Sequence, residues 1–336
     1  MKICICGGGN LGHVCAGFLA NRGHQVSILT TKPERWNSEL KIVAPDGVFT
    51  GKITQISSKP EEVIPQAEMV LVCLPGYAIH DELEKIKPHL SDNTLVGTIV
   101  SSTGFFFEAF KVLPSDIPLF GFQRVPFISR VIEYGKMAEL KGYKDKLHVA
   151  IENTTEKESI REKLEILFEK PVTLADSYYE VSLSNSNPLL HPARLYTMWK
   201  DWQPGIIYPQ NPQFYAEWMV EASTLLLKMD DEFQQLLKAL GLKPGCIPTI
   251  LDYYESTDAI TLTQKLHDIK AFRGILSPMK ESKGGWVPDF SSRYFTEDFP
   301  YGMRFIVETA HEQKVAIPTI KKVYHWGSVL FFREHN

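Results

Sequence analysis

Three glycines near the start of the chain have the spacing that phosphate binding requires. They are Gly7, Gly9 and Gly12, in the pattern G-x-G-x-x-G between an apolar strand and a helix. The first glycine allows a tight turn, the second leaves room for a pyrophosphate, and the third lets the helix pack close to the sheet. Amide groups at the helix N-terminus face the phosphates, so Asn10 and Leu11 are predicted contacts. The pattern predicts a dinucleotide site, and a glycine-rich turn without a ligand is the alternative.

The residues after the second predicted strand bear on the choice of nicotinamide cofactor. Sites selective for NAD carry Asp or Glu at this point, to bind the ribose hydroxyls. This chain has Thr31 and Lys32 there, and Arg35 follows. Hydroxyls and cations suit a 2′-phosphate, so we expect NADP as the cofactor. NAD is the alternative, because Glu34 lies among the cations and such loops rearrange.

Residues of the second half could supply acid/base chemistry beside a nicotinamide. Reduction of a carbonyl or imine needs a proton donor, and a carboxylate substrate is best held by the two-pronged guanidinium of arginine. His191, between Pro188 and Pro192 at a predicted helix entrance, is the candidate donor. Asp298 is the candidate carboxylate beside it, and Arg293 precedes Asp298 in one loop-to-helix stretch. A structural histidine and a helix-capping aspartate are the alternatives.

The elements that must position these residues differ between the two halves of the chain. The first half alternates apolar strands with helices, which predicts a doubly wound parallel sheet over residues 1–180. Strands are expected at 2–6, 25–29, 69–75, 94–100 and 147–151, with short β-like pieces near 51–54, and helices at 11–21, 61–66, 80–90 and 158–168. Leu74 and Pro75 end the third of these strands, and we expect them to contact the cofactor.

From residue 181 onward the apolar spacing is helical. The clearest stripe runs from Phe214 to Leu240 and ends at Gly241, as helices commonly do. Further helices are predicted at 257–271, 301–312 and 317–332. The region 181–336 is therefore expected to form a mainly α-helical second domain.

Composition limits the kinds of partner. The chain has 336 residues and a net charge of −4, which gives no reason to expect nucleic acid or an anionic membrane. No apolar run approaches the ~20 residues of a membrane span, and the start in a strand predicts no signal peptide. The five cysteines lack zinc-ligand spacing, so we expect reduced core thiols, no metal site and a cytoplasmic protein.

The chain resembles the opine dehydrogenases, the octopine and nopaline dehydrogenase family. Beyond the glycines, four motifs spread over nearly the whole chain carry the resemblance. They are Glu34-Arg35-Trp36, Gln123-x-x-Pro126-Phe127-x-x-Arg130, Asn187-Pro188-Leu189-Leu190-His191-Pro192 and Arg293-Tyr294-x-x-Glu297-Asp298-x-Pro300. The last two motifs are the specific ones.

This resemblance implies a Rossmann domain followed by an all-helical domain of the 6-phosphogluconate-dehydrogenase C-terminal-like type, with substrate in the cleft between them. It implies that an amino acid and a 2-oxo acid such as pyruvate condense to an imine, which a nicotinamide hydride reduces. It also implies that His191 is the acid/base, Asp298 pairs with it and Arg293 holds a carboxylate. Gln123 and Asn187 would contact substrate. Some members of the family carry an acidic residue after the second strand and use NAD. This chain has Thr31 and Lys32 there, so the resemblance does not decide between NAD and NADP.

Two other functions stay open. A reductase similar to ketopantoate reductase would act on a 2-oxo acid without an amine, but that family usually depends on a lysine in the helical domain, where this chain offers His191. A nicotinamide-binding sensor would bind cofactor without turnover.

The identity of the amino-acid substrate is also open. Acidic residues at the cleft would select a cationic amino acid, but the sequence does not show which acidic residues reach it. The tryptophans of the second half also fit a homodimer interface.

Overall fold

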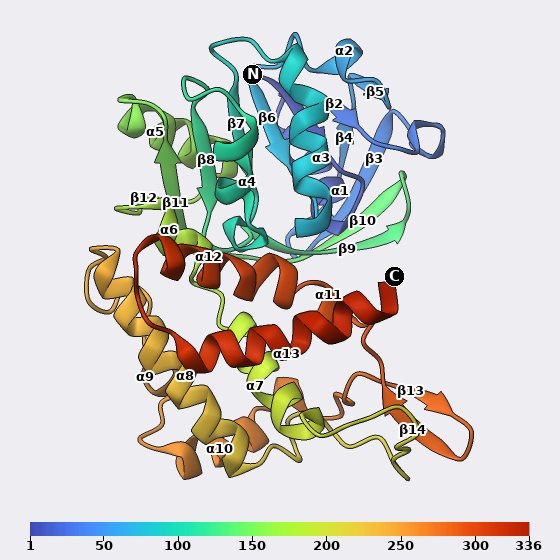
Figure 1. Cartoon of the computed structure of the whole chain (residues 1–336). Helices are drawn as coiled ribbons and strands as arrows, with labels where there is room; N and C mark the ends of the chain where they lie inside the picture. The colour runs from blue at the N-terminus through green and yellow to red at the C-terminus, as the bar shows by residue number, and fades with distance from the viewer. Residues whose placement is uncertain (336) are drawn as a thin grey trace. The chain divides into compact units, whose positions relative to one another are not determined.

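The structure is a computed structural model that describes residues 1–335, with side chains through residue 330. It contains two compact units, Met1–Ser182 and a second unit that begins at Leu183 (Figure 1). No helix of the described part of the chain is both long and apolar enough to cross a membrane.

An eight-stranded sheet forms the centre of the first unit, in the order β12-β11-β8-β7-β6-β1-β2-β5. Its strands are β1 (Lys2–Cys6), β2 (Gln25–Leu29), β5 (Gln55–Ser57), β6 (Met69–Val72), β7 (Leu95–Thr98), β8 (Leu119–Phe122), β11 (Leu147–Glu152) and β12 (Val172–Leu174). All neighbours run parallel except β8 and β11, which are antiparallel. The predicted doubly wound parallel sheet is confirmed, with one reversed strand pair.

Helices cover both faces of this sheet (Figure 1). One core contains residues of α1 (Asn10–Asn21) and α5 (Lys157–Phe168), and the other contains residues of α3 (Gly76–Ile86) and α4 (Phe105–Val112). Strand β1 alternates between them, since Ile3 and Ile5 lie in the first core and Cys4 and Cys6 in the second. A strand buried on both faces reads as a continuous apolar run, which is why it was recognisable. Two short helices complete the unit, α2 (Pro60–Val63) and α6 (Tyr178–Ser182).

A second sheet, of four strands, was not predicted. Its order is β4-β3-β10-β9, from β3 (Glu39–Ala44), β4 (Gly47–Lys52), β9 (Phe127–Glu133) and β10 (Met137–Tyr143). Only the piece near 51–54 had been expected, and β4 in fact ends at Lys52. Buried residues of this sheet join the core under α1. Buried side chains in its strands alternate with more exposed ones, so the strands carry no continuous apolar run.

The second unit is helical apart from one hairpin. Its helices are α7 (Asn187–Trp199), α8 (Val220–Ala239), α9 (Ile250–Tyr253), α10 (Ala259–Asp268), α11 (Arg293–Thr296), α12 (Arg304–Glu312) and α13 (Pro318–His335), and its hairpin is β13 (Met279–Ser282) with β14 (Gly285–Pro288). A π-helical turn, Phe299–Met303, precedes α12. The α/β-then-helical architecture is confirmed, but the two-stranded hairpin departs from the all-helical expectation.

The helix predicted from Phe214 begins only at Val220. Phe214, Tyr215 and Trp218 are buried in the turns before it, where they pack on one another. Their spacing matches a helical stripe by coincidence, because aromatic residues that fill a compact turn also face inward. Tyr215 therefore lies in a turn before α8 and not on a helix.

Candidate functional site

The glycine turn has the shape of a phosphate site. Gly7 has a φ of +115°, and a Cβ at Gly12 would lie 2.1 Å from the carbonyl oxygen of Gly7, so both positions need glycine. A Cβ at Gly9 would meet no atom within 4 Å, which leaves open space at the N-terminus of α1. That helix end has no side-chain cap. Exposed helix amides beside open space are the arrangement that binds the pyrophosphate of a dinucleotide.

The four-stranded sheet is tied to this turn by a buried histidine. His13 directly follows the third glycine, and its Nδ1 donates to the carbonyl oxygen of Gly9 at 2.9 Å. Its Nε2 accepts the backbone N–H of Gly135, in the β9–β10 turn, at 2.7 Å, and its ring stacks on Trp36. Burial lowers the pKa of His13, which agrees with the neutral ring that this bonding requires. The side chain of Asn10 also accepts a hydrogen bond from the backbone N–H of Val131 in β9. Neither of these links could be predicted from the sequence.

A cavity of about 160 Å³ lies beside the glycine turn. It is lined by Gly7, Gly8, Leu29, Thr30, Thr31, Lys32, Leu74, Glu82, Lys85 and Tyr134. The structure therefore brings the predicted residues Thr31, Lys32 and Leu74 together. Burial raises the pKa of Glu82, the one carboxylate among these lining residues.

Three predicted cofactor contacts lie near this cavity without lining it. The guanidinium of Arg35 stands 4.5 Å from the centre of the Tyr134 ring, which does line the cavity. Pro75 follows Leu74 and precedes the first residue of α3. Leu11 is in the first turn of α1, behind Gly9. Leu11, Arg35 and Pro75 follow strands β1, β2 and β6 in turn, so all three lie near the carboxyl ends of these strands.

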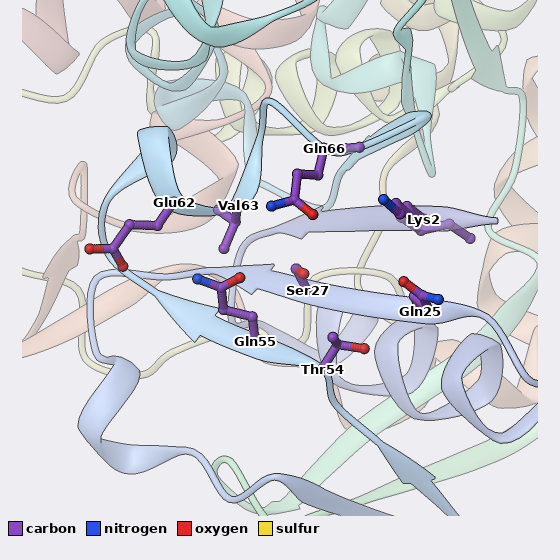
Figure 2. A pocket seen from close by; sticks show the side chains of 10 residues that line it. Lys2, Gln25, Ser27, Thr54, Gln55, Glu62, Val63 and Gln66 are labelled. Carbon is purple, nitrogen blue, oxygen red and sulfur yellow. The ribbon is translucent and has the colours of Figure 1, made fainter.

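A smaller cavity in the same unit lies elsewhere. Its volume is about 50 Å³, and Figure 2 shows Gln25, Ser27, Gln55 and Gln66 around it. Lys2 and Gln25 are the first residues of β1 and β2. The cavity is therefore at the amino ends of the strands, whereas ligands of parallel α/β sheets bind at the carboxyl ends.

In the helical unit, the structure joins the two residues proposed for acid/base work. His191 is on α7, and Asp298 stands directly before the π-helical turn. Nδ1 of His191 and Oδ2 of Asp298 are 2.8 Å apart, and both side chains are largely buried, with 12% and 13% exposed. Asp298 makes no side-chain cap to the turn that follows it. A carboxylate only accepts, so Nδ1 carries the proton in this pair.

Tyr215 is hydrogen-bonded to the other ring nitrogen of His191. Its hydroxyl is 2.9 Å from Nε2, which is the lone-pair nitrogen when the neutral ring donates through Nδ1. Burial raises the pKa of Tyr215, so the hydroxyl keeps its proton. Stacking on Phe272 holds the phenol ring, and Tyr294 packs against the imidazole. Tyr215 was not predicted as a site residue, because its spacing had indicated a helix; the dense Phe214-Tyr215-x-x-Trp218 aromatic cluster was the available signal.

Arg293 makes a two-pronged contact in the structure. Its Nε and Nη2 donate to the two carboxylate oxygens of Glu297 at 2.8 and 2.9 Å, on the exposed side of α11. The guanidinium of Arg293 thus already binds a carboxylate in this geometry.

The two predicted substrate contacts lie in different units. Asn187 is the first residue of α7, and Gln123 follows β8 in the first unit, at the same sheet edge as the glycine turn. Within residues 1–335, no cluster of His, Cys, Asp or Glu could hold a metal ion.

Known proteins match both parts of the chain. Residues 174–331 match the family described as NAD/NADP octopine/nopaline dehydrogenase, alpha-helical domain. Residues 3–104 match the family described as ketopantoate reductase PanE/ApbA. Octopine dehydrogenase of Pecten maximus is 28% identical over 365 residues, which cover 100% of this chain and 91% of that protein.

Solved structures agree with these matches. Octopine dehydrogenase with NADH and L-arginine has a TM-score of 0.84 at 28% identity, over 97% of this chain and 88% of that one. The same enzyme with NADH and pyruvate has a TM-score of 0.84 at 26% identity, over 98% and 89%. The similarity therefore extends through both units.

Proposed function

The chain belongs to the opine dehydrogenase family, and from that premise we propose that it joins an amino acid to a 2-oxo acid by reductive condensation. It is an NAD(P)-dependent dehydrogenase with small-molecule substrates. The amine and the carbonyl condense to an imine with loss of water, and reduction gives an N-(carboxyalkyl) amino acid. Pyruvate is the proposed oxo acid, as in the pyruvate complex of the related enzyme.

The pairing of His191 with Asp298 carries this proposal. The charge of Asp298 stabilises the imidazolium that forms when Nε2 of His191 takes up a proton. Protonated His191 then supplies that proton to the substrate oxygen that leaves as water. A hydroxyl both donates and accepts, so Tyr215 can stay bonded to Nε2 in either protonation state of the ring. When bound, the nicotinamide supplies the hydride.

Arg293 is the proposed ligand for the carboxylate of the oxo acid. Its fork now binds Glu297, whose carboxylate shows the geometry that a substrate carboxylate would adopt. An incoming substrate would share or replace that partner. Gln123 and Asn187 are proposed as further substrate contacts, each at the end of an element where its side chain is half-buried.

We assign cofactor binding to residues 1–180 and substrate binding to residues 181–336. Within the first, Gly7, Gly9 and Gly12 with Asn10 and Leu11 fit the pyrophosphate. NADP is the proposed cofactor, because Lys32 and Lys85 line the cavity after β2 and no acidic residue stands directly at the end of that strand. Arg35, Thr31, Leu74 and Pro75 complete this proposed site.

The alternative is reduction of a 2-oxo acid without an amine, in the manner of ketopantoate reductase. That family matches only residues 3–104, the nucleotide-binding part, whereas the helical part matches the octopine/nopaline dehydrogenases. The proposed acid/base pair, His191 and Asp298, lies in the helical part. The match pattern therefore favours the amine-dependent reaction.

The test follows the loss of reduced-nicotinamide absorbance with NADPH and with NADH. Pyruvate is combined with a panel of amino acids that includes arginine, with amine-free and oxo-acid-free controls. Oxidation that requires both substrates supports the proposal and names the preferred cofactor. Oxidation without amine would support the alternative, and cofactor binding without oxidation across the panel would contradict both and favour a sensor.

A further inference from the structure

A cavity in the helical unit has no role in the proposed reaction. Its volume is about 310 Å³, at the lower end of the range for small-molecule sites. It is lined by Arg194, Thr197, Met198, Trp199, Tyr208, Pro212, Glu217, Met219, Glu221 and Met279. His191, Tyr215 and Asp298 are not among these residues, and the buried ring of Trp218 lies against Arg194.

A buried cation stands in the wall of this cavity. Arg194 is only 4% exposed, and within the described part of the chain its Nε has no hydrogen-bond partner. Its Nη2 donates a hydrogen bond of 2.6 Å to the backbone oxygen of Glu217. This carbonyl oxygen is uncharged, so it does not neutralise the guanidinium. Burial lowers the pKa of Arg194 to about 10, so it is still charged at neutral pH. The charge of Glu217 acts in the opposite sense and raises this pKa, and an anion in the cavity would add a hydrogen-bonded acceptor for a costly buried charge.

The rest of the lining defines the other groups of a ligand. Met198, Met219 and Met279, with the indole of Trp199, offer an adaptable apolar wall. The carboxylates of Glu217 and Glu221 are on the exposed side. One oxygen of Glu217 accepts the N–H of Gln213, and Glu221 pairs with Lys200, which leaves acceptor capacity on both carboxylates.

We propose that this cavity binds a small α-amino acid with an apolar side chain, at a site separate from His191. Arg194 would take the carboxylate, Glu217 and Glu221 the ammonium group, and the methionines the side chain. Each group of the ligand then meets its complement. The ligand is bound and not consumed there, because the lining residues include neither the acid/base pair nor the glycine turn.

The test titrates norleucine into the full-length protein without cofactor, by isothermal titration calorimetry. Hexanoate lacks its ammonium and pentylamine lacks its carboxylate, and we expect both to bind at least about 10-fold more weakly than norleucine. Arg194→Met should weaken norleucine binding by about 10- to 100-fold, the range for a charged hydrogen bond. Met219→Trp, at a residue 61% exposed, should fill the cavity and abolish binding without disturbing the fold.

His191→Ala is the matched control and should bind norleucine like the unchanged protein. Loss of binding in that variant would overturn the separate site. Absence of heat with the unchanged protein, or equal binding by folded Arg194→Met, would overturn the role of Arg194. Equal binding of hexanoate would overturn amino-acid recognition. None of these readouts depends on turnover, so they are independent of the proposed reaction.

Discussion

Replacing Asp298 by asparagine tests the acid/base assignment most directly. The change preserves the size of the side chain, 2.8 Å from Nδ1 of His191, but removes its charge. The new NH₂ group can donate to Nδ1, which moves the ring proton to Nε2. His191 would then donate to Tyr215 and lose the lone pair that accepts a proton.

The magnitude follows from the burial of the pair. A hydrogen bond to a charged group contributes about 1.5–3 kcal/mol, and the low exposure of both side chains, 12% and 13%, favours the upper part of that range. Such a loss corresponds to a factor of about 10 to 150 in rate. The shift of the ring proton from Nδ1 to Nε2 lowers the rate further. We therefore expect kcat to fall by about 10²- to 10⁴-fold, the usual contribution of general acid/base catalysis.

The assay is steady-state oxidation of the reduced nicotinamide with both substrates saturating. Glu297→Gln is the matched control, because Glu297 is the neighbouring carboxylate but binds Arg293 and not His191. It should change kcat by less than about 5-fold, while His191→Ala should match Asp298→Asn within about 10-fold, since the pair acts as a unit. A kcat for Asp298→Asn within about 3-fold of the unchanged enzyme would refute the reasoning.

Three further outcomes are expected. Arg293→Lys should raise the KM for the oxo acid by about 10-fold or more with little change in kcat, because lysine cannot form the two-pronged contact; an unchanged KM would move the carboxylate site elsewhere. Lys32→Glu should reduce the ratio of kcat/KM for NADPH over NADH by about 10-fold or more, with Lys163→Glu on α5 as the control, and an unchanged ratio would remove Lys32 from the site. Gly12→Ala should lower Tm, whereas Gly9→Ala should keep Tm but weaken cofactor binding; equal Tm losses would contradict the open space at Gly9.

The parts of the fold that the sequence predicted are those with a strong local pattern. Strand β6, a run of buried apolar residues, and the glycine turn could be recognised without tertiary information. The four-stranded sheet could not, because β9 and β10 lack a continuous buried run and the sheet depends on long-range pairing of β3 with β10. The link through His13 is equally non-local, since it joins residues far apart in the sequence.

The candidate site shows the same division. The histidine and aspartate motifs named His191 and Asp298, but only the fold shows that they meet across 107 positions of sequence. Tyr215 was hidden because burial in a turn and burial on a helix produce similar apolar spacing. Arg194, two positions after the histidine motif, was not predicted, because residue types do not show that its guanidinium is buried beside a cavity.

The distribution of thiols over the two cores has a practical consequence. Cys4, Cys6, Cys15 and Cys73 are fully or nearly fully buried in the first unit, whereas Cys246, in the loop between α8 and α9, is partly accessible, and none of the five forms a disulfide. A maleimide dye reacts with accessible thiols and should therefore attach to the native protein at Cys246 alone. The natural sequence thus offers one attachment point on the helical unit, through which fluorescence can report ligand binding without any engineered cysteine.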